Sequence, residues 1–441
     1  MAGRSRSRAR YRRCEGTRFV TSLPSARGAP ERGRLDRGSF REPDDETPSR
    51  VDDLQRALAA LTARGTNLTI VLPGRGGERI RLGQCPERTC VTLHSSRAVW
   101  ALRRGDLQAL AEHYLEGRID IEGDPSEMMR LTDILDMGGG RLAQWAFRLQ
   151  LRLPGRRWLN KRSIAFHYDQ SPEFFLAWLE RWRSYSHGLY QLADDTAERA
   201  QARKMQHAID ALCLHPGMDV LDMGCGWGCF LEYAGLQGIR VHGITLSRVQ
   251  HDFVARLISE QRLPCTVELV DFLDYRPGRL FDGAVFMGSL EHMPDYQRVA
   301  SFASQYLTRR ACIYADFLAH PTSRTFGTFM RQNLWPGTSA YVNVARLISV
   351  LTTSGFNIHQ LVDDTRSYAL TVRDWASALE AQRVELARRF GERTVRTFLL
   401  FLWGSHHFFT TNRTQAYHLV AGREPARCSG DDPSVHGGVR G

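Results

Sequence analysis

The chain has 441 residues, of which 42% are hydrophobic and nine are tryptophan, and its formal net charge is +11 at pH 7. This length exceeds that of one ordinary domain, and the apolar content suffices for real cores, so we expect two folded domains and a disordered end. The basic excess favours an anionic partner, which can be nucleic acid, an anionic lipid surface or an acidic small molecule.

The cysteines and the length of the hydrophobic runs limit further which class of protein this chain can be. Nine scattered cysteines do not form a disulfide framework, and Cys85 with Cys90 lacks the second pair that would complete a zinc site. We therefore predict no metal site and a reducing compartment. No run approaches the roughly 18 apolar residues of a membrane-spanning helix, and the N-terminus lacks the apolar core of a signal peptide. We expect a soluble, cytoplasmic protein that is peripheral to the membrane.

The two ends of the chain are predicted to be unstructured. Residues 1–50 mix Arg, Ser, Gly and Pro with almost no apolar periodicity, so they cannot bury enough surface to offset the entropy of ordering. The first third of this Arg-rich tail superficially suits an organelle transit peptide, but a mis-assigned start codon or a solvated tail is the better interpretation. Residues 423–441 are expected to form a flexible C-terminal tail.

Residues 51–152 are predicted to form a small α+β domain. VDDLQRALAALTAR has helical spacing, TNLTIVLP and ERIRLG indicate two strands across a Gly-rich turn, and LQALAEHYLEG indicates a helix closed by Gly117. The segment LAQWAFRLQLRLPGRRWLN, residues 142–160, places Trp145, Phe147 and Leu149 among arginines. Packing between domains is one interpretation of that segment, and an apolar patch ringed by cations for lipid or membrane docking is the other.

Residues 163–422 alternate between strand-like and helix-like segments. The strand-like runs are MDVLDMG, IRVHGITL, CTVELVD, FDGAVFMG and ACIYADFL. Such alternation predicts an α/β domain in which a doubly wound parallel sheet carries helices on both faces.

The stretch VLDMGCGWGCFLEY places a glycine-rich turn between the first of these strands and a helix. Asp222 precedes three glycines at alternate positions, Gly224, Gly226 and Gly228. Glycines here let the backbone N–H groups lie against a ligand. A dinucleotide-binding fingerprint needs a small residue at the sixth position, where this chain has Cys229. The D-x-G-x-G-x-G spacing instead resembles that of S-adenosylmethionine-dependent methyltransferases, in which the turn passes beneath the methionine part of the cofactor.

The ends of the next two strands supply the rest of an adenosyl pocket. Thr245 and Leu246, in GITLSRVQ, stand where the cofactor ribose would sit and where many class I methyltransferases place an acidic residue. Asp271 and Phe272, in VDFLDY, follow the third strand. Asp271 can accept from an adenine amino group while Phe272 lies against the ring.

An ordered set of segments resembles the cyclopropane-fatty-acyl-phospholipid synthases and the related mycolic acid cyclopropane synthases. HYDQSPEFFLAWLERWRSYSHGLY is similar to the family's HYD-x-x-x-x-FY…TYSCAY, GITLSRVQ to GxTLSxxQ, and GSLEHMPDYQRV to FEHxxxxxY. AERAQARKM, LWPGTS, LTTSGFNI, SYALTVRDW and FLLFLWGSHHFF also occur in the family's order. The resemblance covers residues 166–420 and, more faintly, LAEHYLEGRIDIEGD, which resembles the end of the family's N-terminal helical domain.

This resemblance implies a class I methyltransferase with a Rossmann-like fold that uses S-adenosyl-L-methionine. The implied reaction is methyl transfer to the double bond of unsaturated phospholipid acyl chains, giving a cyclopropane or methyl-branched fatty acid. The implied cofactor contacts, from the carboxylate end through methionine and ribose to adenine, are Tyr185 and Ser186, then Gly224 and Gly226, then Thr245, Leu246 and Gln250, and lastly Asp271 and Phe272.

Closure of a cyclopropane requires a base beside the transferred methyl. The resemblance implies a bound bicarbonate, which the family holds with a Cys, a Glu, a His, an Ile backbone and a Tyr. Glu291 and Tyr368 match, whereas His187 replaces the Cys, Asp316 replaces the His and Leu318 replaces the Ile. An added carboxylate repels an anion, while a protonated His187 holds one and a neutral His187 is itself a base. Asp316 either orients His187 or displaces the anion, so bicarbonate and His187 remain alternatives.

Other histidines and aromatic residues leave two interpretations open. His292 is expected to be structural, and His406 and His407 to pack or to line a substrate channel, because no partner stands at metal-ligand spacing. Near the C-terminus, an aromatic stripe forms either ordinary core or the wall of an acyl tunnel; its members are Phe401, Trp403, Phe408 and Phe409.

Two other function classes compete with lipid methylation. One is a methyltransferase that uses the same fold on a small molecule. The other is a nucleic-acid-binding protein with a vestigial cofactor site, which is disfavoured because no base-stacking or basic-helix motif supports it. The sequence is also compatible with a homodimer.

Overall fold

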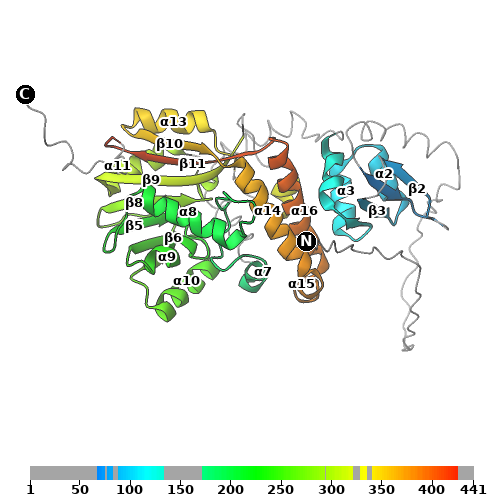
Figure 1. The fold of residues 1–441 in the computed structure, drawn as a ribbon, viewed down its shortest axis with the longest axis horizontal. Coiled ribbons are helices and arrows are strands. Elements are labelled where there is room, and N and C mark those ends of the chain that lie inside the picture. Colours follow the sequence, from blue (N-terminus) through cyan, green and yellow to red (C-terminus); the bar gives the residue numbers. More distant parts are fainter. Residues whose placement is uncertain are drawn as a thin grey trace, which may run out of the picture. The chain divides into compact units, whose positions relative to one another are not determined.

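The computed structural model describes residues 67–74, 77–82, 88–133, 171–293, 295–320, 328–334 and 340–425. All of these residues belong to one compact unit of the chain, which contains a small sheet and a large sheet (Figure 1). Several predictions lie outside the described residues: the Arg-rich tail, the helix VDDLQRALAALTAR, the segment around Trp145 and nearly all of the C-terminal tail.

The small sheet has four strands in the order β2-β1-β3-β4. The predicted strand pair is confirmed, because β1 and β2 are antiparallel with Leu68 opposite Leu82. The predicted helix is α3, which ends at Leu115, and Gly117 follows it with φ +72°. The elements of this region are β1 Leu68–Val71, β2 Arg79–Leu82, β3 Thr89–Leu93, α2 Ser96–Arg103, α3 Leu107–Leu115, β4 Ile119–Gly123, α4 Pro125–Met129 and η1 Arg130–Asp133.

The large sheet has seven strands in the order β10-β11-β9-β8-β5-β6-β7. The five strands predicted from sequence, β5 to β9, are parallel to one another. β10 and β11 were not predicted; they are antiparallel and form one edge region, so the predicted parallel pairing holds for the other five strands. The strands are β5 Asp219–Met223, β6 Arg240–Thr245, β7 Thr266–Leu269, β8 Phe281–Met287, β9 Leu307–Ala319, β10 Asn357–Asp363 and β11 Gln415–Gly422.

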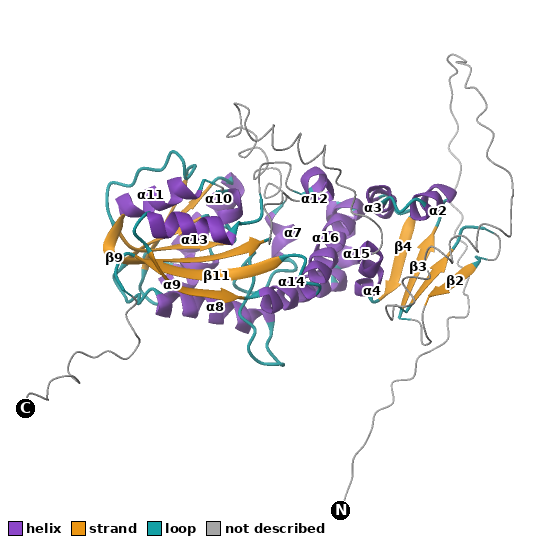
Figure 2. Cartoon of the chain, turned by 90° about the horizontal axis from the view of Figure 1, so that it is seen from above, coloured by secondary structure: helices purple, strands orange, loops and turns teal. Residues whose placement is uncertain are grey.

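Helices cover both faces of the large sheet, which confirms the doubly wound α/β class (Figure 2). α8 and α9 pack their apolar sides on one face, and α11 and α13 pack on the other. The helices are α7 Pro172–Leu176, α8 Ala197–Ala211, α9 Cys229–Gly235, α10 Arg248–Gln261, η2 Leu290–His292, α11 Tyr296–Tyr306, α12 Thr328–Asn333, α13 Val344–Thr353, α14 Thr365–Ala381, α15 Arg383–Phe390 and α16 Glu392–Thr410. No helix among the described residues combines the length and apolar character needed to cross a bilayer.

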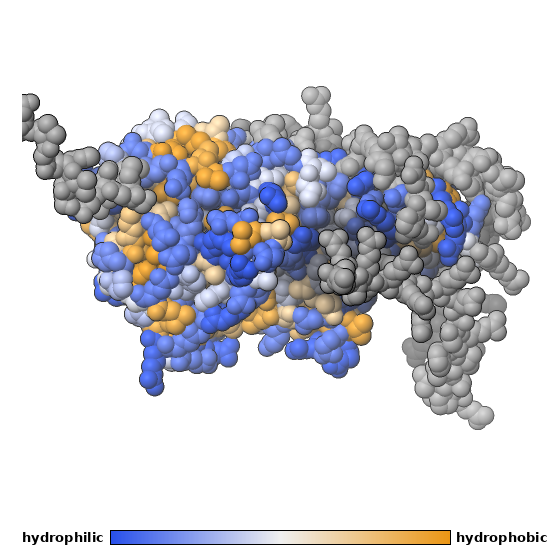
Figure 3. Space-filling view, in the orientation of Figure 1, coloured by the Kyte–Doolittle hydropathy of each residue, from blue (hydrophilic) through white to orange (hydrophobic). Residues whose placement is uncertain are grey.

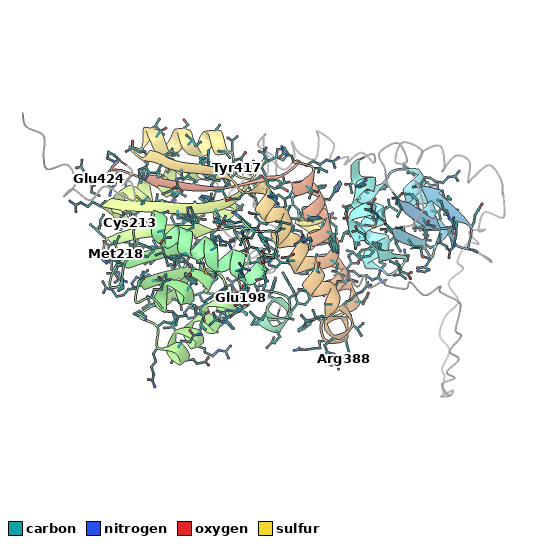
Figure 4. All side chains as sticks on the ribbon, in the orientation of Figure 1. Glu198, Cys213, Met218, Arg388, Tyr417 and Glu424 are labelled. Atoms are coloured by element: carbon teal, nitrogen blue, oxygen red, sulfur yellow. The ribbon has the colours of Figure 1, made fainter. Side chains whose placement is uncertain are left out.

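β11 runs between β9 and β10, with Tyr417 on the strand and Glu424 just beyond its end (Figure 4). Register with β9 places His418 opposite Asp316. After the strand, the Arg423 guanidinium donates to the carbonyls of Ser304 and Thr308. The last strand is therefore fixed along its length and at its C-terminal end.

A cluster of aromatic side chains joins α7, α14 and α16 beside the loop that leads into α8. The ring centroids of Phe174 and Phe398 are 4.9 Å apart, and those of Trp178 and Trp375 are 6.1 Å apart; both pairs are edge-on. Tyr185 stacks on Trp375 with ring centroids 5.3 Å apart. Such pairs stabilise beyond their area burial, so the cluster fixes the backbone around Tyr185.

Candidate active site

A cavity of about 320 Å³ lies at the carboxyl ends of β5, β6, β7 and β8. This is where open parallel sheets bind ligands, and the volume falls within the roughly 300–1,000 Å³ of small-molecule sites. All predicted cofactor residues except Gly228 line it: Tyr185, Ser186, Asp222, Gly224, Gly226, Thr245, Leu246, Gln250, Asp271 and Phe272. We call it the first cavity.

The three glycines of the glycine-rich turn serve two purposes: they leave room for a ligand in the first cavity, and they let the turn pack closely on neighbouring side chains. Gly226 has φ +52° and no atom within 4 Å of a built Cβ, so only its backbone conformation and the adjoining cavity demand glycine. Gly224 has φ +97°, and a Cβ there would meet Ser289 Cβ at 2.9 Å. Gly228 does not line the cavity; its Cβ would approach Val254 Cγ2 to 3.1 Å, so it lets the turn pack on α10.

Hydrogen bonds fix the loops that follow β6 and β7. Thr245 Oγ1 donates to Gln250 Oε1 at 3.0 Å, and Ser247 Oγ caps α10 by accepting from the Gln250 N–H. After β7, Asp271 Oδ1 accepts from the Leu273 N–H at 2.9 Å. Phe272 packs edge-on against Phe302. The residues predicted at the ribose and adenine are thus held by their own local turns.

A second cavity of about 70 Å³ adjoins the first, and Tyr185, Gly288 and His292 line both. Glu291 and Tyr368, the two residues that match the resemblance at the predicted base, lie in its wall. Most of the remaining wall is apolar or aromatic, formed by Leu318, Met330, Tyr341, Val372, Trp375, Phe401, Phe408 and Phe409, with Ser405 and Thr414. Three members of the C-terminal aromatic stripe therefore face this cavity, and Trp403 does not.

Glu291 is nearly buried and is held from one side. Its Oε1 accepts from the Leu318 N–H at 2.7 Å, while Oε2 has no hydrogen-bond partner among the described residues. Burial raises the pKa of Glu291 to about 7, the Leu318 N–H opposes the rise, and the charge of Asp316 adds to it. Burial also lowers the pKa of the neighbouring His292 to about 4.

His187 lines neither cavity. Its ring is fully buried and lies 5.0 Å from that of Tyr368. Its Nε2–H donates to Asp364 Oδ2 at 3.0 Å, and the same oxygen accepts from His418 Nδ1 at 2.5 Å. Burial alone would raise the pKa of Asp364, but these hydrogen bonds hold it well below its usual range. Asp364, and not Asp316, is therefore the carboxylate that orients His187.

Asp316 is engaged in a separate buried network. Its Oδ2 lies 3.5 Å from Lys204 Nζ, and both side chains are fully buried. Lys204 donates to Ser186 Oγ at 2.7 Å and to Ser184 Oγ at 3.0 Å, and Ser186 Oγ donates to Asp316. Like His187, Asp316 lines neither cavity. The network fixes the loop from which Ser186 faces the first cavity.

Residues 156–419 match the family described as mycolic acid cyclopropane synthetase. The chain belongs to this family. A probable fatty acid methyltransferase of Pseudomonas putida is 27% identical over 364 residues, which are 78% of this chain and 89% of the relative. Cyclopropane mycolic acid synthase 2 of Mycobacterium bovis is 26% identical over 276 residues, which are 57% of this chain and 91% of the relative.

Solved structures show the same fold as this member of the cyclopropane synthetase family. A cyclopropane synthase from Mycobacterium tuberculosis superposes with a TM-score of 0.55 at 24% identity, covering 59% of this chain and 97% of that one. A coclaurine N-methyltransferase bound to SAH superposes with a TM-score of 0.59 at 16% identity, covering 72% and 99%. The chain is an S-adenosylmethionine-dependent methyltransferase, and the predicted class I fold is confirmed.

Two buried polar atoms show that the first cavity of this family member fits a cationic cofactor. Asp222 Oδ1 and Ser289 Oγ are buried without hydrogen-bond partners among the described residues. Burial raises the pKa of Asp222 to about 7, Lys204 opposes the rise, and Asp316 adds to it. S-adenosylmethionine carries an ammonium and a sulfonium, so it supplies the positive charge and the donors that these atoms lack.

The sequence did not reveal Lys204, Asp364 or His418 as part of the site of this family member. Lys204 is one helical residue among several charged ones, and Asp364 had only the signal of an acidic residue just before a helix. His418 would have been placed next to Asp316 if the alternation in QAYHLVAG had been recognised as a strand beside β9. The pairing of distant segments therefore hid these residues.

Proposed function

We propose that this enzyme transfers the methyl group of S-adenosylmethionine to the double bond of an unsaturated fatty acyl chain of a phospholipid, giving a cyclopropane fatty acid. The observation that carries the proposal is the wall common to the two cavities, formed by Tyr185, Gly288 and His292. Such an arrangement brings a methyl donor in the first cavity next to an alkene in the second. Positioning of this kind is a major source of acceleration for a poorly nucleophilic alkene.

The lining of the second cavity supports an acyl chain as the occupant. Aromatic rings and aliphatic side chains bury hydrocarbon favourably, and Glu291 is the only carboxylate in the wall as described. Phe408 and Phe409 come from α16 and Val372 from α14, so two packed helices enclose the space. At about 70 Å³ the cavity surrounds the part of the chain near the double bond.

The dry wall also suits the charge that develops on the lipid. Transfer of a methyl cation to an alkene leaves positive charge on the neighbouring carbon, which water would capture. Exclusion of water protects this species, and the aromatic rings of Tyr185, Tyr368 and Trp375 can stabilise a cation through their faces. Loss of a proton from the new methyl then closes the three-membered ring, whereas loss from the chain leaves a methyl branch.

We further propose that the enzyme reaches its lipid by peripheral contact with an anionic membrane surface. On α2, Trp100 is 59% exposed and Arg104 lies over its ring at 4.3 Å, with Arg97 one turn earlier. Indole and guanidinium groups suit the interface of a bilayer with anionic head groups. On the face seen in Figure 3, hydrophobic residues form separate patches among hydrophilic ones.

The experiment combines purified enzyme, S-adenosylmethionine and vesicles of monounsaturated phospholipid, followed by mass spectrometry of the acyl chains. The expected product carries one added CH₂ unit, and vesicles of fully saturated lipid remain unchanged. Formation of S-adenosylhomocysteine without any change in the lipid would contradict the proposal and favour a small-molecule acceptor. Nuclear magnetic resonance of the product distinguishes a ring from a methyl branch.

A further inference from the structure

Glu291 is the only carboxylate in the wall of the second cavity, within the part of the chain that the structure describes. It lies in η2 directly after β8 and is 5% exposed. Its Oε1 is anchored by the Leu318 N–H on β9. Its Oε2 is buried and has no hydrogen-bond partner among the described residues. One oxygen therefore positions the carboxylate, and the other remains available to a ligand.

An unpartnered carboxylate oxygen in an apolar cavity is costly for folding, so its presence calls for a functional explanation. Burial raises the pKa of Glu291 to about 7. A base with a pKa near the working pH combines a large ionised fraction with a strong tendency to accept a proton. The environment of Glu291 thus gives it the two properties that a proton acceptor requires.

The other basic groups near the cavity are less suitable as acceptors. His187 donates to Asp364, is fully buried and lines neither cavity. Asp316 pairs with Lys204 and also lines neither cavity. His292 lines both cavities, but burial lowers its pKa to about 4, which makes it a weak base.

The same geometry disfavours a bound anion such as bicarbonate. The Leu318 N–H, a donor at the cavity wall, is already occupied by Glu291 Oε1. Glu291 itself repels an anion when ionised, and the charge of Asp316 acts in the same direction. Lys204 lies 3.5 Å from Asp316 and offsets part of that charge, but it lines neither cavity and so does not offer its ammonium to an anion there.

We propose that Glu291 Oε2 is itself the base that closes the cyclopropane ring, without a bound bicarbonate. The proposal rests on the function proposed above. The π electrons of the alkene bond to the methyl carbon as the methyl–sulfur bond breaks, and that bonding pair stays on sulfur. Oε2 then takes one proton from the new methyl, and the freed C–H electron pair forms the second bond of the ring. Glu291 is left protonated and returns its proton to water on product release.

The test replaces Glu291 by Gln, which keeps an oxygen to accept from the Leu318 N–H but removes the base. Wild-type enzyme with cofactor deuterated in the methyl group should give a ring that retains two of its three deuterons. Glu291→Gln should lower ring formation by at least about 100-fold, the smaller end of the range for general-base catalysis. Any methylated lipid that it forms should keep all three deuterons. Calorimetry should show unchanged cofactor binding, so misfolding is excluded.

The protonation of Glu291 can be followed in two ways as pH changes, and the first of them does not require turnover. Difference infrared spectra between wild type and Glu291→Gln should show one carboxylate that titrates at about pH 7. Ring formation by wild type should fall as pH drops through the same value, because the protonated acid cannot accept a proton. Asp222 in the first cavity has a raised pKa of similar value, which makes the variant the necessary reference. Other titratable groups facing Glu291 are Asp316 with Lys204, His292, Tyr185, Tyr296, Tyr341 and Tyr368.

Four results separate this inference from the function on which it rests. Ring formation that stops on exhaustive removal of carbonate and returns with it would overturn Glu291 as the base, and so would ring formation by Glu291→Gln at wild-type rate. Ring formation unaffected by carbonate supports it. If wild type adds no methyl to any lipid, the proposed function fails and the ring-closing step with it.

Discussion

Asp364 Oδ2 accepts hydrogen bonds from two histidines at once, His187 at 3.0 Å and His418 at 2.5 Å. The three residues come from the loop before α8, the start of α14 and the strand β11. A single buried carboxylate therefore ties together three segments around the site. His187 Nδ1 and His418 Nε2 are buried and have no hydrogen-bond partner among the described residues, so Asp364 is the contact that fixes both rings.

Replacement of Asp364 by Asn should reduce the free energy of unfolding by about 2 kcal/mol at pH 7, because two hydrogen bonds to a charged acceptor are lost or weakened. The folded-state pKa of Asp364 is lowered, so its contribution is present above the unfolded-state pKa and is lost as pH falls through the folded-state value. Urea denaturation at neutral and acidic pH measures both effects. Asp252→Asn is the control, since Asp252 pairs with His251 at the surface. A loss equal to that of the control would contradict the prediction.

Replacement of Lys204 by Met should destabilise the protein by about 3–5 kcal/mol, because it leaves the buried charge of Asp316 unpaired. The double variant Lys204→Met with Asp316→Asn removes that charge and should recover more than half of the loss. Denaturation of both variants provides the measurement. Equal stability of single and double variants would show that the pair does not interact. Calorimetry should also show weaker cofactor binding in the single variant, since Ser186 loses its donor.

Gly226→Val should abolish S-adenosylmethionine binding while the fold remains intact. A side chain there enters the region of the first cavity without meeting protein atoms. Gly355→Val is a matched control, because Gly355 also has a positive φ and no atom within 4 Å of a built Cβ, but lies outside both cavities. Calorimetry measures affinity and circular dichroism the fold. Unchanged affinity in Gly226→Val would remove the cofactor assignment of the turn.

Ser405→Phe should fill part of the second cavity and reduce lipid methylation by at least about 10-fold, while cofactor affinity stays unchanged. Ser405 lines only the second of the two cavities, so its enlargement leaves the first intact. Initial rates with monounsaturated vesicles measure the loss. Full activity would mean that the acyl chain binds elsewhere. Ser377→Phe, on an exposed position of α14, controls for the added ring.

Trp100→Ala should weaken binding to anionic vesicles, and Arg97→Glu with Arg104→Glu should weaken it further. Wild-type binding should rise with the anionic lipid fraction and fall with salt, since exposed charges are screened beyond about 10 Å at 0.1 M ionic strength. Vesicle sedimentation measures both. Val384→Ala, at a residue that is 84% exposed, is the control for loss of an exposed apolar side chain. Salt-independent binding would argue against an electrostatic contact.

Most of the fold could be predicted from local sequence signals. The buried runs of β5, β8 and β9 and the turn after Asp222 are continuous in sequence, so periodicity and glycine spacing reveal them. β10 was missed because all of its residues are exposed or half-buried, so NIHQLVD carries no hydrophobic pattern. β11 was missed because it follows the long helix α16 and not a crossover typical of a parallel sheet.

Residues of the site could be predicted from the sequence only where they belong to a local motif. Residues such as Thr245 and Asp271 follow strand ends, so the sequence places them in the first cavity. The orientation of His187 depends on Asp364, which is 177 residues away. Whether Asp316 faces a histidine or a lysine depends on which side of β9 it occupies relative to α8. Neither fact is encoded in local spacing, so the choice between bicarbonate and His187 stayed open.

The position of β11 between β9 and β10 also constrains how the protein is made. β11 is the C-terminal strand of the described chain, yet it fills the gap between two strands that are synthesised earlier. Until Gln415–Gly422 leaves the ribosome, β9 and β10 each expose an unpaired edge, a surface to which other strands can add. His418 reaches Asp364 only with this final insertion. Completion of the sheet and assembly of the buried histidine pair therefore both wait for this last strand.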